Sequence, residues 1–128
     1  LTMATLYAIG QSLGYLVAGT GNRSEIYMGY FTKWGDGAHD LTPIADLTVT
    51  EIYELLDYLN APLSIRTKAP SAGLYEGQTD EQEMGVSYAS IDEYLLKGTT
   101  DPAALEIIKK AHDKTEHKRK SALIYSRS

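Results

Sequence analysis

The sequence contains no cysteine, which excludes structural disulfides, thiolate metal sites and a cysteine nucleophile. No apolar run approaches the roughly 20 residues of a membrane-spanning helix, so we expect a soluble protein without a membrane partner. The first ten residues carry no basic side chain, so they do not resemble a secretory signal. They also lack an initiator methionine, which favours an internal fragment. The three histidines lack metal-ligand spacing, and no serine lies in a G-x-S-x-G turn, which disfavours a zinc site and a serine hydrolase.

The 128-residue chain is 43% apolar and 23% charged, which is typical of one globular domain. Its net charge of -5 conceals an asymmetry, because residues 1–108 carry five basic and fifteen acidic side chains whereas residues 109–128 carry seven and two. The acidic body disfavours nucleic acid as a partner. Two interpretations of the basic end stay open: a solvated helix end that complements the helix dipole, or an arm that folds over an anionic small molecule.

Helix signals recur along the chain. Leu6, Ile9 and Leu13 repeat at helical spacing, and Thr48–Glu51 has the pattern of a capping box. Phe31–Leu47 and Lys68–Thr79 are expected to be loops, the second of them mobile. We expect helices over Thr2–Leu13, from near Arg23 (capped by Asn22 or Gly21) to about Tyr30, and from the Thr48 box to Asn60. Further helices are expected over Thr79–Met84, from Ser87 or Ser90 to about Leu96, and from Ala103, behind Asp101 and Pro102, to about Thr115.

A short apolar run follows the first of these helices. Tyr15–Ala18 fits a buried strand, and the glycine-rich turn Gly19–Asn22 comes directly after it. A helix, a buried strand, a glycine turn and a second helix form the repeating unit of a parallel sheet, so we predict an α/β fold. No second convincing strand is present, although a parallel strand needs neighbours. We therefore expect Tyr15–Ala18 to pair with strands of an N-terminal half that this chain does not contain.

The turn after this strand is a candidate phosphate site, because open α/β sheets bind ligands at the carboxyl ends of their strands. Glycines let a phosphate approach the backbone, and the helix N-terminus favours an anion. Thr20 offers a hydroxyl to that phosphate, and Glu25 offers a hard oxygen ligand for Mg²⁺. A tight crossover without a ligand, with Glu25 as a partner of the helix dipole, explains the same residues equally well.

A second candidate region is the aromatic loop that follows. It combines Lys33 and Asp36 with Tyr30, Phe31 and Trp34, a mixture that suits a pocket for a ring and a charged group. Solvated loop charges are the alternative interpretation.

Five blocks stand in collinear order over nearly the whole chain: Gly19–Glu25, Gly29–Gly37, Ala69–Leu74, Gly77–Glu81 and Thr115–Arg119. Together they resemble the C-terminal half of the ammonia-dependent NAD⁺ synthetases, which belong to the N-type ATP pyrophosphatases. The resemblance implies an α/β domain with a Rossmann-like parallel sheet of the adenine nucleotide alpha hydrolase type. Residues 1–128 would be its C-terminal part, mostly helical with one clear strand and without the N-terminal phosphate-loop half. It also implies a cytoplasmic homodimer.

The resemblance further implies ATP-dependent amidation of deamido-NAD⁺ with ammonia, which yields NAD⁺, AMP and pyrophosphate with Mg²⁺ as the cofactor. A carboxylate is a poor electrophile, so its oxygen would first attack the α-phosphorus of ATP and form an acyl adenylate. Ammonia would then attack the activated carbonyl and displace AMP.

Residue by residue, the resemblance assigns roles to eight positions. Thr20 and Ser71 would contact ATP, Glu25 would hold Mg²⁺, and Asp36 would belong to the ammonia pocket. Four positions would contact deamido-NAD⁺: Lys33, Asp40, His117 and Lys118.

Three departures accompany the resemblance. The family's serine-glycine-glycine phosphate loop, with its Mg²⁺-binding carboxylate, is absent from this chain. Val49 stands where the family usually has a lysine for ATP, and no arginine occurs near Thr2, where the family uses one on the dinucleotide. We therefore expect the isolated chain to be inactive. The alternative is a non-catalytic relative that retains nucleotide binding or dimerisation only.

Overall fold

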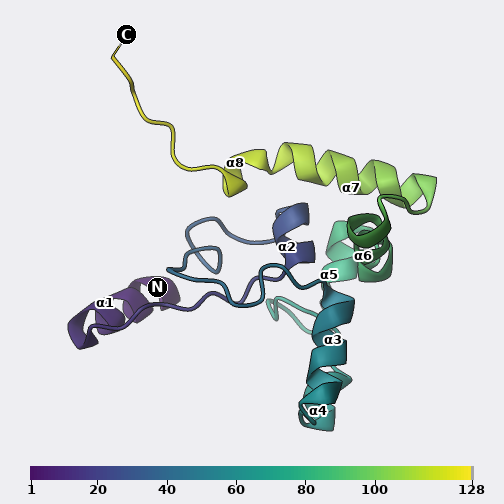
Figure 1. Cartoon of the computed structure of the whole chain (residues 1–128), viewed down its shortest axis with the longest axis horizontal. Coiled ribbons are helices and arrows are strands. Elements are labelled where there is room, and N and C mark those ends of the chain that lie inside the picture. Colours follow the sequence, from purple (N-terminus) through teal and green to yellow (C-terminus); the bar gives the residue numbers. More distant parts are fainter. Residues whose placement is uncertain (128) are drawn as a thin grey trace.

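The computed structural model describes residues 1–127, and its regular structure is helical throughout (Figure 1). None of the helices among these residues has the length and apolar character needed to cross a membrane. The helices are α1 (Thr2–Leu13), α2 (Arg23–Met28), α3 (Val49–Tyr58), α4 (Leu63–Arg66), α5 (Asp80–Met84), α6 (Tyr88–Lys97), α7 (Pro102–Lys114) and α8 (Glu116–Arg119).

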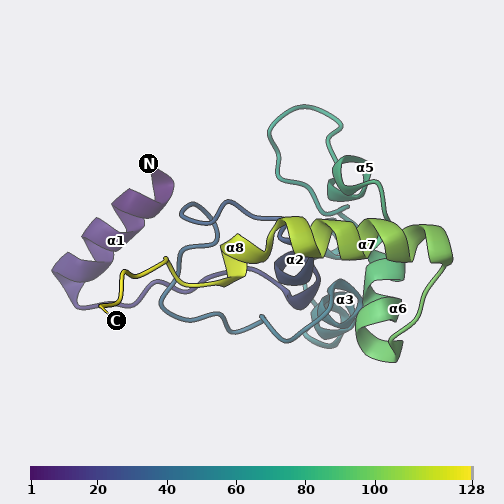
Figure 2. The same ribbon diagram turned by 90° about the horizontal axis from the view of Figure 1, so that it is seen from above.

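The core lies where α2, α3, α6 and α7 meet. Ile91 of α6 and Ile108 of α7 are fully buried there. The other buried apolar residues of the cluster are Met28, Val49, Val86, Tyr88 and Ala104. Figure 2 shows α7 running across α2 and α6, while α1 stands apart at the opposite end in both views. The apolar stripe of α1 is therefore uncovered: Leu6, Ile9 and Leu13 are 45%, 51% and 57% exposed.

Local capping explains most helix boundaries and confirms the helices expected from the sequence. Asn22 and Glu25 form a reciprocal capping box at the start of α2, and Thr48 and Glu51 form another at the start of α3. Ser87 caps α6, so of the two serines considered for that start the first is used. Thr79 and Asp101 cap α5 and α7, and the left-handed glycines that end α1, α2, α5 and α6 are Gly14, Gly29, Gly85 and Gly98.

The one clear strand expected at Tyr15–Ala18 is not confirmed within residues 1–127. Within residues 1–127 the segment is extended, but it forms only an isolated parallel bridge between Ala18 and Leu41. Val17 is buried, whereas Tyr15 and Leu16 are 68% and 72% exposed. A parallel ladder needs hydrogen bonds along the strand, and the segment around Leu41 supplies them on one edge only.

Two smaller differences concern the helices. The four-residue helices α4 and α8 are absent from the sequence expectation, because a single turn leaves no measurable periodicity. The helix α3 ends at Tyr58, before the expected Asn60, and Asn60 itself adopts a positive φ of 50°. Lys68–Thr79 contains no helix or strand, as expected for a loop.

Candidate active site

The glycine-rich turn before α2 is held close to the chain segment around Leu41. The amide of Gly19 donates to the carbonyl of Leu41 over 2.7 Å. A Cβ at Gly19 would lie 2.8 Å from both His39 Cβ and Thr42 Cγ2, so only glycine fits this approach. The turn then enters α2 through Asn22, whose backbone amide donates to Glu25 Oε2 over 3.0 Å. The capping box thus fixes the Glu25 carboxylate at the start of α2.

Hydrogen bonds within the loop after α2 determine its shape. The carboxylate of Asp36 accepts from the amide of Thr32 over 2.8 Å, and the amides of Gly35 and Gly37 both donate to the Thr32 carbonyl over 3.0 Å. A Cβ at Gly37 would come within 2.5 Å of the Phe31 ring. Asp36 therefore has a structural role in this loop, and its second oxygen has no hydrogen-bond partner within residues 1–127.

The basic segment at α8 folds against this loop and against the end of α2. Lys118 Nζ donates to the carbonyls of Gly29 and Phe31 over 2.8 and 2.7 Å. Arg119 donates to the carbonyl of Tyr27 over 3.2 Å. These cations thus meet the negative end of the α2 dipole, and they do so on a neighbouring helix rather than on their own. Lys118 and Arg119 are therefore not purely solvated, whereas an arm that folds over an anionic small molecule stays a prediction.

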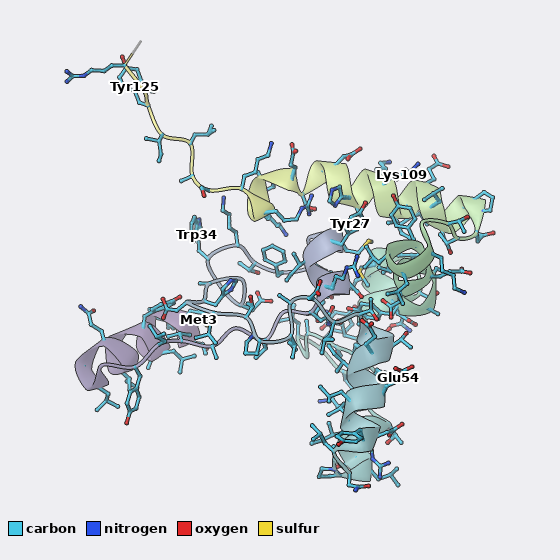
Figure 3. The ribbon with its side chains drawn as sticks, in the orientation of Figure 1. Met3, Tyr27, Trp34, Glu54, Lys109 and Tyr125 are labelled. Carbon is cyan, nitrogen blue, oxygen red and sulfur yellow. The ribbon has the colours of Figure 1, made fainter. Side chains whose placement is uncertain are left out.

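Lys33, in the loop after α2, also contacts the basic segment at α8. Its Nζ donates to the backbone oxygens of His117 and Lys120 over 2.7 and 3.0 Å and lies 5.1 Å from the centroid of the Trp34 ring. Figure 3 shows Trp34 projecting from the loop beside the chain that leaves α8, and its side chain is 72% exposed.

A cavity of about 490 Å³ lies between the glycine turn, the loop and the segment after α8. It brings together five of the eight positions singled out from the sequence: Thr20, Glu25, Lys33, Asp36 and Lys118. A second cavity of about 470 Å³ adjoins it and shares Phe31, Asp36 and Lys118 with it.

The other three positions do not line either cavity. The carboxylate of Asp40 accepts from the amide of Val17 over 2.7 Å, and the hydroxyl of Ser71 accepts from the amide of Gly73 over 3.1 Å. His117 contributes its backbone oxygen to Lys33. Val49 is 7% exposed in the core at the start of α3 and also lies outside both cavities.

The electrostatics of the cavity centre on Glu25. Partial burial raises the pKa of its carboxyl group, the hydrogen bond from the Asn22 backbone lowers it, and the nearby charges of Asp80 and Asp36 raise it further. The net shift is upward from the ordinary value of 4.5. The ionised form of Glu25 is therefore disfavoured where it lies, chiefly by burial, and a cation bound beside it would favour that form.

Sequence reasoning missed Asp80, the first residue of α5. Asp80 is 3% exposed, and its Oδ2 accepts from the Tyr88 hydroxyl over 2.8 Å. Its Oδ1 is buried without a hydrogen-bond partner within residues 1–127. Burial and this carboxylate together raise the pKa of the Tyr88 hydroxyl. An acidic residue in the first turn of a helix looks like a dipole partner, so no sequence signal marks it as buried.

The fit to Mg²⁺ rests on one carboxylate. Within residues 1–127 no three histidine, cysteine or acidic side chains gather in a way that could hold a metal. Two carboxylates line the cavity, those of Glu25 and Asp36, and of these Asp36 holds the loop through the Thr32 amide, so Glu25 is the candidate ligand. Mg²⁺ is commonly held by one or two protein carboxylates together with substrate phosphates, so Glu25 fits as one ligand of a site that phosphates would complete.

Comparison with known sequences identifies the family. The sequence model described as NAD synthase matches residues 1–126. The NH(3)-dependent NAD(+) synthetase of Carboxydothermus hydrogenoformans is 55% identical over 120 residues, and that of Alkaliphilus oremlandii is 51% identical over 119 residues. These matches cover 94% and 93% of this chain but 49% and 48% of the relatives. The chain thus spans about half the length of the curated relatives it matches.

Solved structures of NMN and NAD synthetases are also similar to this chain. An NMN synthetase from Francisella tularensis matches with a TM-score of 0.93 at 49% identity, covering 97% of this chain and 52% of that chain. An NH3-dependent NAD synthetase from Campylobacter jejuni in complex with the nitrate ion matches with a TM-score of 0.71 at 34% identity, covering 98% and 52%. The family model and these relatives agree over nearly every residue, and the chain belongs to the NAD synthase family.

Proposed function

We propose that this chain forms the C-terminal part of an ammonia-dependent NAD⁺ synthetase. The enzyme converts deamido-NAD⁺, ATP and ammonia into NAD⁺, AMP and pyrophosphate. The single observation that carries the proposal is the cavity that gathers Thr20, Glu25, Lys33, Asp36 and Lys118 from segments far apart in the sequence. Family membership and the identity to NH(3)-dependent NAD(+) synthetases support it.

The reaction proceeds in two displacements. The nicotinate carboxylate oxygen attacks the α-phosphorus of ATP, the bond to the β-phosphate oxygen breaks, and pyrophosphate leaves with that electron pair. The acyl adenylate then presents a carbonyl carbon with a good leaving group. Ammonia attacks this carbon, AMP leaves, and one proton passes from nitrogen to a base. Exclusion of water is essential, because water would hydrolyse the adenylate.

Thr20 and Glu25 serve the ATP side of the cavity. The Thr20 hydroxyl and the turn around it contact the triphosphate, and the Glu25 carboxylate supplies one oxygen to Mg²⁺. When held there, the ion would supply positive charge that offsets the charge of the phosphates. Ser71 contacts ATP from the loop Lys68–Thr79, whose closing would exclude water.

Asp36 serves the ammonia side. One of its oxygens is committed to the Thr32 amide, which leaves the other to attract ammonium and accept its proton. Lys33 and Lys118 place positive charge at the cavity rim, and both are oriented by backbone carbonyls. Together with Asp40 and His117 they bind the dinucleotide. Asp40 binds the dinucleotide while its carboxylate keeps the hydrogen bond from the Val17 amide.

The remaining parts of the proposal concern the whole protein. A segment upstream of this chain supplies a phosphate loop, a second metal-binding carboxylate and the neighbouring strands of a Rossmann-like sheet. The enzyme is a cytoplasmic homodimer. The uncovered stripe of α1 supports contacts with a further part of the protein or with a second subunit.

A second candidate is amidation of the mononucleotide, nicotinic acid mononucleotide, to NMN. The observation that favours it is the NMN synthetase match, whose TM-score of 0.93 exceeds the 0.71 of the NAD synthetase. Both acceptors carry the same reacting carboxylate, so the chemistry argued for this cavity serves either.

The test is an amidation assay on the full-length protein with ATP, Mg²⁺ and ammonia. Each acceptor is supplied in turn, and AMP and the amidated product are quantified. We expect equal amounts of NAD⁺ and AMP, with a higher kcat/KM for deamido-NAD⁺. A higher kcat/KM for the mononucleotide would favour the second candidate. Nucleotide binding without AMP formation from either acceptor would identify a non-catalytic relative instead.

A further inference from the structure

A buried carboxylate outside the cavity links three helices. Asp92 of α6 is 3% exposed. Its Oδ1 accepts from the Ser24 hydroxyl of α2 over 2.5 Å, and its Oδ2 accepts from both the amide and the hydroxyl of Thr50 in α3, over 2.7 and 2.6 Å. Both oxygens are thus occupied by donors that come from the first turns of two other helices.

Within residues 1–127, Asp92 forms no ion pair. The three ion pairs within residues 1–127 are those of Arg66 with Asp57, Lys97 with Glu93 and Lys120 with Glu116. Charge-assisted hydrogen bonds and the positive end of the α3 dipole therefore stabilise the Asp92 carboxylate. Burying an ionised group in this way is costly when a donor is lost, so the arrangement of these three residues is tightly specified.

The Asp92 cluster lies directly behind the proposed metal ligand. Ser24, fully buried, immediately precedes Glu25, and its hydroxyl oxygen also accepts from the amide of Val49 over 3.3 Å. One residue earlier, Arg23 donates to the carbonyl of Leu95 in α6 over 3.3 Å. The inner side of the first turn of α2 is therefore fixed on α6 and α3, while Glu25 on the same turn lines the cavity.

We propose that Asp92 is a positioning residue for the reaction: through Ser24 it holds the first turn of α2 so that the Glu25 carboxylate presents its oxygen to the metal of Mg·ATP. The inference rests on the proposed function of Glu25. Asp92 touches neither cavity, so its effect passes only through the helix turn. Loss of a partner that orients a metal ligand typically weakens metal affinity about 10- to 100-fold.

The experiment compares Asp92→Ala and Asp92→Asn in the full-length enzyme. Activity is measured against Mg²⁺ concentration at saturating ATP and acceptor. We expect Asp92→Ala to raise the half-saturating Mg²⁺ concentration about tenfold or more. Asp92→Asn keeps the shape and one acceptor oxygen, so it should produce a smaller rise and thus a partial rescue. The control is Ile108→Val, which loosens the core from α7 and removes none of the hydrogen-bond partners of Asp92.

A second readout does not depend on the reaction. The amide of Glu25 donates to Asn22 Oδ1 over 2.8 Å, so its hydrogen exchange reports the geometry of the turn. We expect faster exchange at Glu25 in Asp92→Ala than in Ile108→Val at matched global stability. An unchanged Mg²⁺ dependence in Asp92→Ala, while Glu25→Gln shifts it, would overturn the proposal. If Glu25→Gln shifts nothing, the metal role of Glu25 fails, and the exchange rate alone then decides whether Asp92 holds the turn.

Discussion

At the scale of single residues, Glu25 illustrates a group whose site disfavours its charge. A carboxyl whose pKa is raised in the folded protein binds its proton more tightly there than in the unfolded chain. Its contribution to the free energy of unfolding is therefore fully present below the unfolded-state pKa and is lost as the pH rises through the folded-state pKa. At neutral pH the ionised Glu25 costs stability.

Glu25→Gln should consequently stabilise the protein at pH 7. Glutamine at this position still accepts the Asn22 amide, so the capping box survives. We expect a gain in the range of about 0.5 to 2 kcal/mol that single stabilising substitutions give. Below the ordinary pKa of 4.5 the carboxyl group of Glu25 is mostly protonated in the folded and the unfolded chain, so the difference should become small. Urea denaturation of both proteins at pH 7 and pH 4 measures this, and a loss of stability at pH 7 would contradict it.

Gly29 permits a second prediction at this scale. It ends α2 with a φ of 67°, and a Cβ there would overlap the hydroxyl of Thr115. Gly98 ends α6 with a φ of 78° and has nothing within 4 Å of such a Cβ. Gly98→Ala should cost about 1 to 2 kcal/mol for the left-handed backbone alone. Gly29→Ala should cost a further amount of about 1 to 3 kcal/mol for overpacking.

Thermal denaturation of the two alanine variants separates these terms. Gly29→Ala should also displace Thr115, whose hydroxyl accepts from Arg119 over 2.9 Å, and so loosen the basic segment. Equal melting temperatures for the two variants would show that the approach of Thr115 carries no energetic consequence.

At the scale of elements, the helices that the sequence predicts well are those with local caps. The boxes at Asn22 and Thr48 and the caps at Ser87 and Asp101 need only neighbours three residues away, so their signals are complete in the sequence. A strand has no such local signal, because its hydrogen bonds come from other segments. The apolar composition of Tyr15–Ala18 therefore indicates burial in a sheet that these residues alone do not form.

The candidate site likewise contains residues that the local sequence can indicate and residues that only tertiary packing brings together. Glycines, Thr20 and Glu25 could be predicted because the turn and the helix start are contiguous in sequence. Asp92 could not, since a charged residue in the middle of α6 normally faces solvent and only tertiary packing brings it to Ser24. Lys118 could be placed on a basic segment, but its carbonyl partners 87 and 89 residues away could not be inferred from spacing.

The contact between α8 and the end of α2 depends on Lys118 and can be tested by substitution. Lys118→Met removes both donors to Gly29 and Phe31 and leaves two carbonyls less satisfied, which should cost about 1 to 3 kcal/mol. It should also speed hydrogen exchange at the Gly37 amide and raise the KM for the dinucleotide. Lys114→Met is the matched control, because Lys114 is exposed in the last turn of α7. Indistinguishable exchange in the two variants would exclude a role of Lys118 in ordering the loop.

At the scale of the whole molecule, the exposed apolar side chains follow a pattern. Those of α1, the extended segment after it and the chain after α8 lie away from the helical core, at the end where α1 stands apart (Figures 1 and 2). Leu16, Leu123 and Ile124 are 72%, 104% and 86% exposed. Surfaces of this kind are normally covered by another part of a protein or by a partner.

The extended segment offers the sharpest test of what covers this end. In a parallel ladder, alternate amides point to opposite edges. The amides of Val17 and Gly19 already donate to Asp40 Oδ2 and to the Leu41 carbonyl, both over 2.7 Å, whereas those of Leu16 and Ala18 have no partner within residues 1–127. A strand from an upstream half would pair with the second set alone.

Hydrogen exchange should therefore alternate along Tyr15–Gly19. In the 128-residue chain by itself, we expect protection at Val17 and Gly19 and none at Leu16 and Ala18. In a longer protein with the upstream half of its relatives, all four amides should be protected, because the free edge is then paired. Val17 and Gly19 are internal controls for folding in both samples. If Leu16 and Ala18 exchange equally fast in both, no strand adds to this edge, and the α/β sheet predicted for the complete protein does not pass through Tyr15–Ala18.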